Sequence, residues 1–187
     1  EVLRENAAYE ARINEAEEAL SRRGFPRTAI FRQPVVWGEH DQYQHVNNAH
    51  YIRWFESARM RWMERMSRTL SPEIASNLVR GRGVGIILAS TYCRYRRPVT
   101  YPDTVVIGQA ALPMKFADRV TVRSQAYSVA QSAIVAEADF ECVAYDYDRL
   151  CKASLPPEVA DALRAWTYTG EDKEPYCQKT SRRKTVS

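Results

Sequence analysis

The sequence predicts an α+β fold in which one antiparallel sheet curls around a single long helix. The first observation is the order of the elements, since one strand and a long helix precede four β-rich segments. The second is that the connections between those segments are too short for helical crossovers, so the strands should pair antiparallel. The third is the bulky apolar face of the helix, which suits a position inside a curled sheet.

The chain opens with a polar amphipathic helix over residues 4–22. Its thin apolar stripe needs a surface to lie on, either in this domain or on a partner, and Gly24 ends the helix. A strand follows over residues 29–37, where Pro34 favours a sheet edge over a central position.

The long helix runs from a cap at Asn47 or Asn48 to about Met66. Large apolar side chains recur on it at steps of three and four, so we interpret its bulky stripe as core rather than as the wall of an acyl tunnel. Two shorter helices are expected over residues 72–79 and 156–166. The β-rich segments cover residues 84–97, 104–112, 119–129 and 133–147.

Composition indicates a globular protein with a real core, since 45% of the residues are hydrophobic and 27% are charged. No apolar run approaches the roughly 18 residues that a membrane-spanning helix needs. The formal net charge of +4 is too modest for a dedicated nucleic-acid binder. It suits a phosphate-bearing ligand, and equally an acidic macromolecular surface.

Three regions are expected along the chain: a helical extension over residues 1–27, a central domain over 28–150, and a C-terminal helix with a basic polar tail over 151–187. The tail should be flexible or dock on a partner, and its basic residues are Arg182, Arg183 and Lys184.

The cysteines and the first residue bear on the compartment. None of the cysteines forms a CxxC pair, which argues against a zinc cluster, and we expect reduced thiols at Cys93, Cys142, Cys151 and Cys177. The chain begins at Glu1 rather than Met, which is compatible with a cleaved targeting peptide. We expect a mitochondrial location, with the cytoplasm as the alternative.

The stretch from Asp41 to Arg59 carries the chemistry. Its pattern is Asp41, then His45-Val46-Asn47-Asn48, then Tyr51, then Phe55-Glu56 and Arg59 on the following helix. This pattern resembles the signature of the 4-hydroxybenzoyl-CoA thioesterase-like family. The resemblance covers residues 29–148 and implies the hot-dog fold, an acyl-CoA substrate with no further cofactor, and a homodimer or tetramer with sites at the subunit interface.

The resemblance implies that Asp41 is the catalytic carboxylate, acting either as nucleophile or as general base for water. Backbone amides near Asn47 to Ala49, at the positive end of the helix, would stabilise the oxyanion. The alternative is that Asp41 only caps a turn. His45 could orient the carboxylate or polarise a carbonyl, or only shape the loop.

The remaining candidates have structural alternatives as well. Asn47 and Asn48 are good helix caps, and Asn48 could also act in catalysis while Asn47 positions the substrate. Tyr51 is expected to contact the substrate, and Glu56 and Arg59 can form an ion pair with a secondary role in the site. Arg94 and Arg96 could hold coenzyme A phosphates, together with Arg97 and Lys115, or be solvated strand charges.

The spacing of the histidines and the residue at position 44 are two further features of the motif. The three histidines, His40, His45 and His50, are spaced by five residues, which does not converge three ligands on a helix or a strand, so no metal is expected. The family often has glycine where this chain has Gln44, and glycine there would allow a tight backbone or close approach of a ligand.

Two functions remain open from the sequence. The first is an acyl-CoA thioester hydrolase that uses Asp41. The second is a non-catalytic hot-dog scaffold in a larger assembly, such as a mitochondrial ribosome, with RNA or ribonucleoprotein contacts. The added N-terminal helix, the basic tail and the arginines at 94, 96 and 97 motivate the second function.

Overall fold

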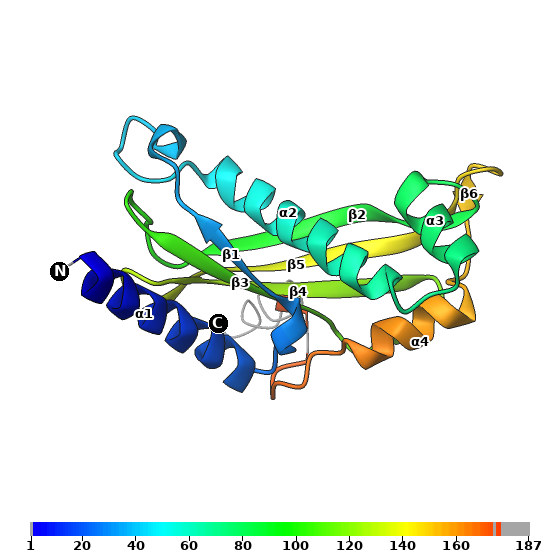
Figure 1. Ribbon diagram of the computed structural model, residues 1–187. Helices are drawn as coiled ribbons and strands as arrows, with labels where there is room; N and C mark the ends of the chain where they lie inside the picture. Colours follow the sequence, from blue (N-terminus) through cyan, green and yellow to red (C-terminus); the bar gives the residue numbers. More distant parts are fainter. Residues whose placement is uncertain (1, 174, 177–187) are drawn as a thin grey trace, which may run out of the picture.

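The computed structural model describes residues 2–173, 175 and 176 (Figure 1). The helices are α1 (Val2–Arg22), α2 (Asn48–Ser67), α3 (Pro72–Arg80) and α4 (Pro157–Ala165), with single 3-10 turns at Arg27–Ala29 and Trp37–Glu39. The strands are β1 (Ile30–Pro34), β2 (Val84–Tyr95), β3 (Thr104–Ala111), β4 (Arg119–Ser128), β5 (Ala133–Asp146) and β6 (Cys151–Lys152). The antiparallel sheet curls around α2, so the α+β prediction is confirmed.

The strands pair antiparallel as expected, and the structure adds the strand order, which the sequence did not specify. The strand order is β1-β3-β4-β5-β2, with β6 beside β5, so β2 pairs with β5 and not with the strand that follows it in sequence. The connection over residues 96–103 is short but crosses the end of the sheet, where it is held by Val99, whose carbonyl accepts a bond from the Val46 amide. As a result β1 and β2 are the two edges, and Pro34 ends an edge strand as expected.

The inner face of the sheet packs on α2 and forms the main core. Phe55 is fully buried and meets Phe140 of β5 edge-on, with ring centroids 5.8 Å apart. Trp62 and Met66 are also buried, which agrees with their interpretation as core. Residues of α3 and α4 close the far end of this core, so that α2 is enclosed along most of its length.

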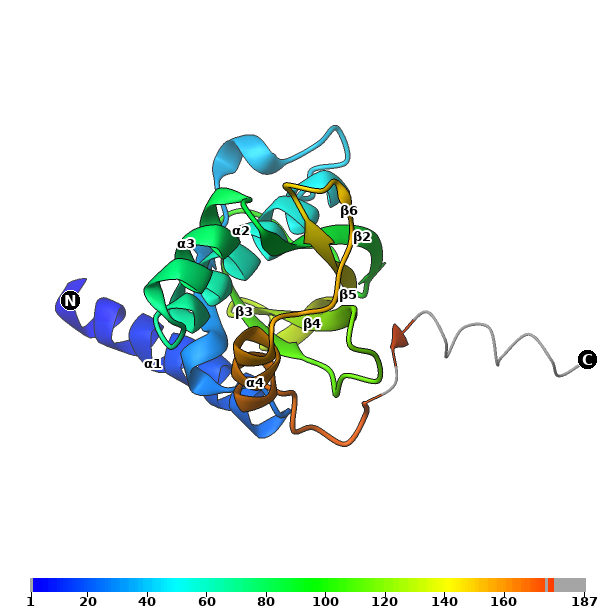
Figure 2. The ribbon, with the colours of Figure 1, turned by 90° about the vertical axis from the view of Figure 1, so that its right-hand side faces the viewer.

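The outer face of the sheet carries a second core, on which α1 lies (Figure 2). Ile13, Ala16 and Leu20 of α1 pack with Phe25, Val106 and Ala110. Every residue of β3 is therefore buried, because both of its faces are covered. The surface that the N-terminal helix requires is thus the sheet of its own chain.

A C-terminal segment, residues 167–173 with 175 and 176, crosses the same outer face. The Thr169 amide donates to the Gly24 carbonyl at 3.0 Å, and the two chain segments touch so closely that a Cβ on Gly24 would lie 2.0 Å from the Gly170 nitrogen. Gly24 has φ +100°, which only glycine adopts without strain.

Under this segment lies a buried ion pair between neighbouring strands. The Arg123 guanidinium donates two 3.0 Å bonds to the Asp139 carboxylate, and the Tyr176 ring covers the guanidinium at 3.9 Å. The Tyr176 amide donates to the same carboxylate at 2.6 Å. The C-terminal segment therefore satisfies charges that the sheet buries.

Several expectations concern the compartment and the tail. Cys93, Cys142 and Cys151 are free thiols, whereas Cys177 and the basic residues Arg182, Arg183 and Lys184 lie outside the described residues. Among the helices that the structure describes, none has the length and apolar character needed to cross a membrane.

Candidate active site

The candidate site begins with a tight turn between β1 and α2, visible at the N-terminal end of α2 in Figure 1. His40 and Val46 form an isolated antiparallel bridge, and the Asp41 amide donates to the His45 carbonyl at 2.9 Å. The Asp41 carboxylate accepts a 2.8 Å bond from the Tyr43 amide. Asp41 therefore stabilises the turn and also carries a carboxylate into the space beside it.

Gln44 has φ +61°, in the left-handed region. This is the position where the resembled family often has glycine, and the backbone here takes the conformation that glycine favours. The Gln44 amide closes the turn by donating to the Asp41 carbonyl at 3.0 Å. The tight turn is thus kept without glycine, at the cost of strain in one residue.

The first turn of α2 lies next to Asp41, and Asn47 organises its amides. The Asn47 side chain accepts from the Ala49 amide at 2.9 Å, and its carbonyl accepts from the His50 amide at 2.9 Å. The Asn47 amide itself donates to the Glu39 carbonyl. Within residues 2–173, 175 and 176 the Asn48 amide has no acceptor, so it is the available donor at this helix start.

Glu39 connects the turn to α2 through hydrogen bonds of its carboxylate. Its carboxylate accepts 2.8 Å bonds from the Val36 amide and from the Trp54 indole, and the His50 imidazole lies 3.7 Å away. His40 is used differently, since its Nε2 accepts from the Tyr101 amide at 2.7 Å. These contacts fix the loop at both ends and leave its tip beside the cavity.

A cavity of about 720 Å³ opens between this turn, the start of α2 and the end of β2. Six of the residues selected from the sequence line it, namely Asp41, His45, Asn47, Asn48, Tyr51 and Arg96. The other three, Glu56, Arg59 and Arg94, are not among its lining residues. The structure therefore brings the motif from Asp41 to Tyr51 together, and places the motif's helical end elsewhere.

Two tyrosines form the apolar wall of the cavity. Tyr51 is buried, and its ring meets the Tyr95 ring edge to face, with the ring centroids 5.2 Å apart. Burial raises the pKa of Tyr51 to about 12. Burial also raises the pKa of Tyr95, whose hydroxyl donates to the Asn48 carbonyl at 3.1 Å. Both phenols therefore stay protonated at neutral pH and act as neutral surfaces or donors.

The two arginines of the cavity differ in their partners. The Arg96 guanidinium pairs with Glu137, its Nε at 2.7 Å from the carboxylate. Arg97 is exposed, and no ion pair links it to the described residues. Since β2 ends at Tyr95, strand alternation no longer separates these two side chains, and both reach the cavity.

Glu56 and Arg59 lie further along α2. Their charged atoms are 3.9 Å apart, with Glu56 largely exposed and Arg59 buried over the Phe140 ring at 4.8 Å. The Arg59 Nη1 is buried without a hydrogen-bond partner among the described residues. This geometry fits the ion pair that the sequence predicted for these two residues.

Sequence reasoning missed Tyr43, Tyr95 and Pro98 as lining residues, and named Arg97 only together with Arg94, Arg96 and Lys115 as a candidate for holding coenzyme A phosphates. Tyr43 lies within the motif and could have been found from its position in the turn. Tyr95 and Pro98 come from the end of β2, and only the strand order shows that this end meets α2. Among the described residues no three potential metal ligands lie together.

The comparisons with known proteins agree with this architecture. Residues 35–163, more than half of the chain, match the thioesterase-like superfamily, and the chain belongs to that family. The structure has the hot-dog fold of its solved relatives, as the motif predicted.

Individual relatives are distant. A protein of Aquifex aeolicus (strain VF5), provisionally named an esterase, is 24% identical over 135 residues, which is 72% of this chain and 97% of that protein. A Pseudomonas aeruginosa PAO1 protein superposes with a TM-score of 0.63 at 22% identity, over 76% of this chain and 93% of its own. A 1,4-dihydroxy-2-naphthoyl-CoA thioesterase from Synechocystis gives a TM-score of 0.61 at 16% identity, over 72% and 94%.

Proposed function

We propose that this protein hydrolyses an acyl-CoA thioester in the cavity beside Asp41. One observation carries the proposal: the Asp41 carboxylate and the start of α2, with the Asn48 amide available, open on the same space. A thioester needs a nucleophile or an activated water on one side of its carbonyl carbon and hydrogen-bond donors on its oxygen. The two groups supply these requirements from adjacent parts of one turn.

In the general-base route, the Asp41 carboxylate takes a proton from water and the resulting oxygen attacks the carbonyl carbon. The negative charge on the carbonyl oxygen is met by the Asn48 amide and by the positive end of α2. Collapse of this intermediate breaks the C–S bond, and the coenzyme A thiolate receives the proton from the Asp41 carboxyl. The products are a carboxylic acid and a free thiol.

In the nucleophilic route, a carboxylate oxygen of Asp41 attacks the carbonyl carbon itself and releases the thiolate, which takes a proton from solvent. Water then cleaves the mixed anhydride, which regenerates the carboxylate and frees the acid. Hydrolysis in ¹⁸O water under single-turnover conditions separates the routes. Label enters Asp41 only by the nucleophilic route, when water attacks the anhydride at the Asp41 carbonyl.

The substrate's phosphates require cations near the cavity mouth. Arg97 is exposed there, and Arg96 is near its own carboxylate partner, so Arg97 is the better candidate for a phosphate contact. Tyr51 and Tyr95 offer an apolar wall to the acyl end. Because the acyl group is not specified by these contacts, the test uses short, medium, long and aromatic acyl-CoAs.

We also propose that two copies pair through β2. This strand is 12 residues long and forms one edge of the sheet, and Leu88 and Tyr95 on it are 44% and 39% exposed. An uncovered edge of this length readily pairs with another strand. Pairing there would bring each Asp41 cavity, which Tyr95 lines, close to the second copy.

The decisive experiment compares the wild-type chain with Asp41→Asn in an assay of thiol release. Asparagine keeps an oxygen that can accept from the Tyr43 amide, so the turn should persist while turnover is lost. Asp161→Asn, on the exposed face of α4, is the matched control and should keep full activity. No turnover of any acyl-CoA by the wild type, or equal turnover by Asp41→Asn, would refute the proposal.

The scaffold alternative rests on the basic residues, since α1 already buries its apolar stripe on its own sheet. Its test is co-migration of the native protein with ribosomes through a sucrose gradient in low and high salt. A discrete dimer or tetramer in both salts favours the enzyme, whereas ribosomal co-migration that resists salt favours the scaffold.

A further inference from the structure

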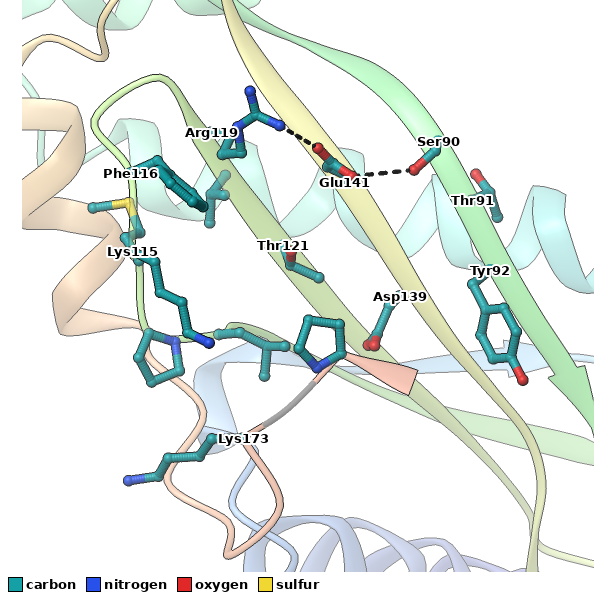
Figure 3. Close-up of a pocket in the computed structure, with 15 residues that line it drawn as sticks. Ser90, Thr91, Tyr92, Lys115, Phe116, Arg119, Thr121, Asp139, Glu141 and Lys173 are labelled. Atoms are coloured by element: carbon teal, nitrogen blue, oxygen red, sulfur yellow. Dashed lines mark hydrogen bonds and ion pairs between the residues drawn. The ribbon is translucent and has the colours of Figure 1, made fainter. Parts of the chain in front are cut away.

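A second cavity, of about 470 Å³, lies on the face of the sheet opposite to α2 (Figure 3). Phe140 of β5 packs inward with the core, so its neighbours Asp139 and Glu141 point to the other side. The cavity has one wall from the β3–β4 connection and another from the C-terminal segment. Its size is within the range of pockets for small organic ligands.

The floor of this cavity is polar but its negative charges are already balanced. Asp139 is bonded to Arg123 and to the Tyr176 amide. Glu141 accepts from Arg119 at 2.9 Å, and its second oxygen has only a 3.5 Å contact with the Ser90 hydroxyl. The floor can therefore accept a further hydrogen bond, and it is a poor surface for an aliphatic chain, which would desolvate it without compensation.

The walls of the cavity carry positive charge and an exposed aromatic ring. Lys115 and Lys173 line it, and neither lysine has an ion pair within the described part of the chain. Figure 3 shows the Lys115 side chain extending from the β3–β4 connection into the cavity. Beside it, the Phe116 ring is 61% exposed and carries the Arg119 guanidinium on it at 5.4 Å.

We propose that this outer-face cavity is a binding site for a nucleoside phosphate. A flat base can stack on the face of the Phe116 ring that the Arg119 guanidinium leaves open, and its amino group can donate to the open oxygen of Glu141. The phosphate meets Lys115, which extends into the cavity, and Lys173, whose side chain extends away from the floor in Figure 3 and turns toward the bound anion. A fatty acid matches this combination less well, since it has an anion but neither a flat ring for Phe116 nor donors for the floor.

The site is separate from the cavity beside Asp41. The two cavities share no lining residue and lie against opposite faces of the sheet, near different parts of β2. Ser90 lines the outer cavity, whereas Tyr95 lines the inner one. Binding here therefore makes no use of Asp41 and does not depend on the proposed hydrolysis.

The test is titration calorimetry of the full chain with ADP, adenosine, pyrophosphate and decanoate. ADP should bind, and adenosine and pyrophosphate should each bind at least about tenfold more weakly, since each lacks half of the contacts. Lys115→Ala combined with Lys173→Ala should raise the Kd for ADP about tenfold or more, as should Phe116→Ala. Arg53→Ala with Arg61→Ala removes the same charge from the exposed side of α2 and should leave the Kd unchanged.

The variants also distinguish the two cavities. If Arg97→Ala weakens ADP binding and the lysine pair does not, the nucleotide occupies the Asp41 cavity and the proposal is overturned. Failure of ADP to bind at millimolar concentration overturns it as well. Binding of decanoate tighter than ADP, with loss in the lysine variant, would assign the cavity to an aliphatic anion instead.

Discussion

The carboxylate of Glu39 accepts a 2.8 Å hydrogen bond from the indole nitrogen of Trp54, 15 positions later in the chain. This bond joins the turn that holds Asp41 to the second turn of α2, and the same carboxylate also receives the Val36 amide. Glu39 is outside the family motif, yet it fixes the two parts of the site against each other.

Replacement of Glu39 by alanine should therefore lower the free energy of unfolding by about 1–3 kcal/mol, because the buried Trp54 N–H loses its acceptor. Trp54→Phe removes the donor of the same bond. In a double-mutant cycle, the variant that carries both changes should therefore lose less stability than the sum of the two single losses. Urea denaturation measures all three variants. Additive costs would mean that the two residues are not coupled.

Gln44→Gly should raise the free energy of unfolding by up to about 1 kcal/mol. The residue is held at φ +61°, where a side chain costs about 1–2 kcal/mol and glycine costs nothing, while the entropy of glycine in the unfolded chain offsets part of the gain. Gln44→Ile is the opposite control and should destabilise, since a β-branched residue tolerates this conformation least. Equal midpoints for both variants in urea would contradict the strain argument.

The folded protein should lose stability as the pH rises above about 9. Burial raises the pKa of Cys142 from 9.0 to about 11 and that of Tyr51 from 10.0 to about 12. Between the unfolded and the folded pKa of each group, the unfolded chain has released a proton that the folded chain still holds. The free energy of unfolding therefore falls as the pH rises. Below about pH 8 both groups stay protonated in the folded and the unfolded chain and contribute no slope.

Urea midpoints between pH 8 and pH 11 measure this slope. The combination of Cys142→Ala with Tyr51→Phe removes both titrating groups and should flatten the fall relative to wild type. An identical slope in that variant would show that other groups are responsible.

The buried pair of Arg123 and Asp139 should be the most costly ion pair to break. Arg123→Met leaves the Asp139 carboxylate buried beneath Tyr176, and the expected loss is about 3–5 kcal/mol. Combining Arg123→Met with Asp139→Leu removes both charges and should recover part of this loss. Arg164→Met, in an exposed pair with Asp161, is the control and should change stability by less than about 1 kcal/mol.

The sequence was most informative where one segment determines its own structure. The helix cap at Asn47, the edge position of Pro34 and the core role of Trp62 follow from local spacing and residue type, and the structure agrees. The family motif was specific enough to locate the turn at Asp41.

What the sequence could not provide depends on contacts between distant segments. The pairing of β2 with β5 moves Tyr95 next to Asn48, and no local pattern encodes that step across the sheet. The thin apolar stripe of α1 defined a face but not its partner, because Ile13 and Leu20 would fit many apolar surfaces equally well. The outer-face cavity is built from five separate segments and has no motif.

The junction of Gly24 with Thr169 and Gly170 has a practical consequence for anyone who engineers this chain. Trimming to residues 28–150 would remove α1 and the C-terminal segment together and leave the apolar side chains of Val106 and Ala110 in water. Removing either end alone would deprive the other of its neighbour at this junction. The smallest fragment worth expressing is therefore the span from the first turn of α1 to Tyr176, and purification tags belong beyond those limits.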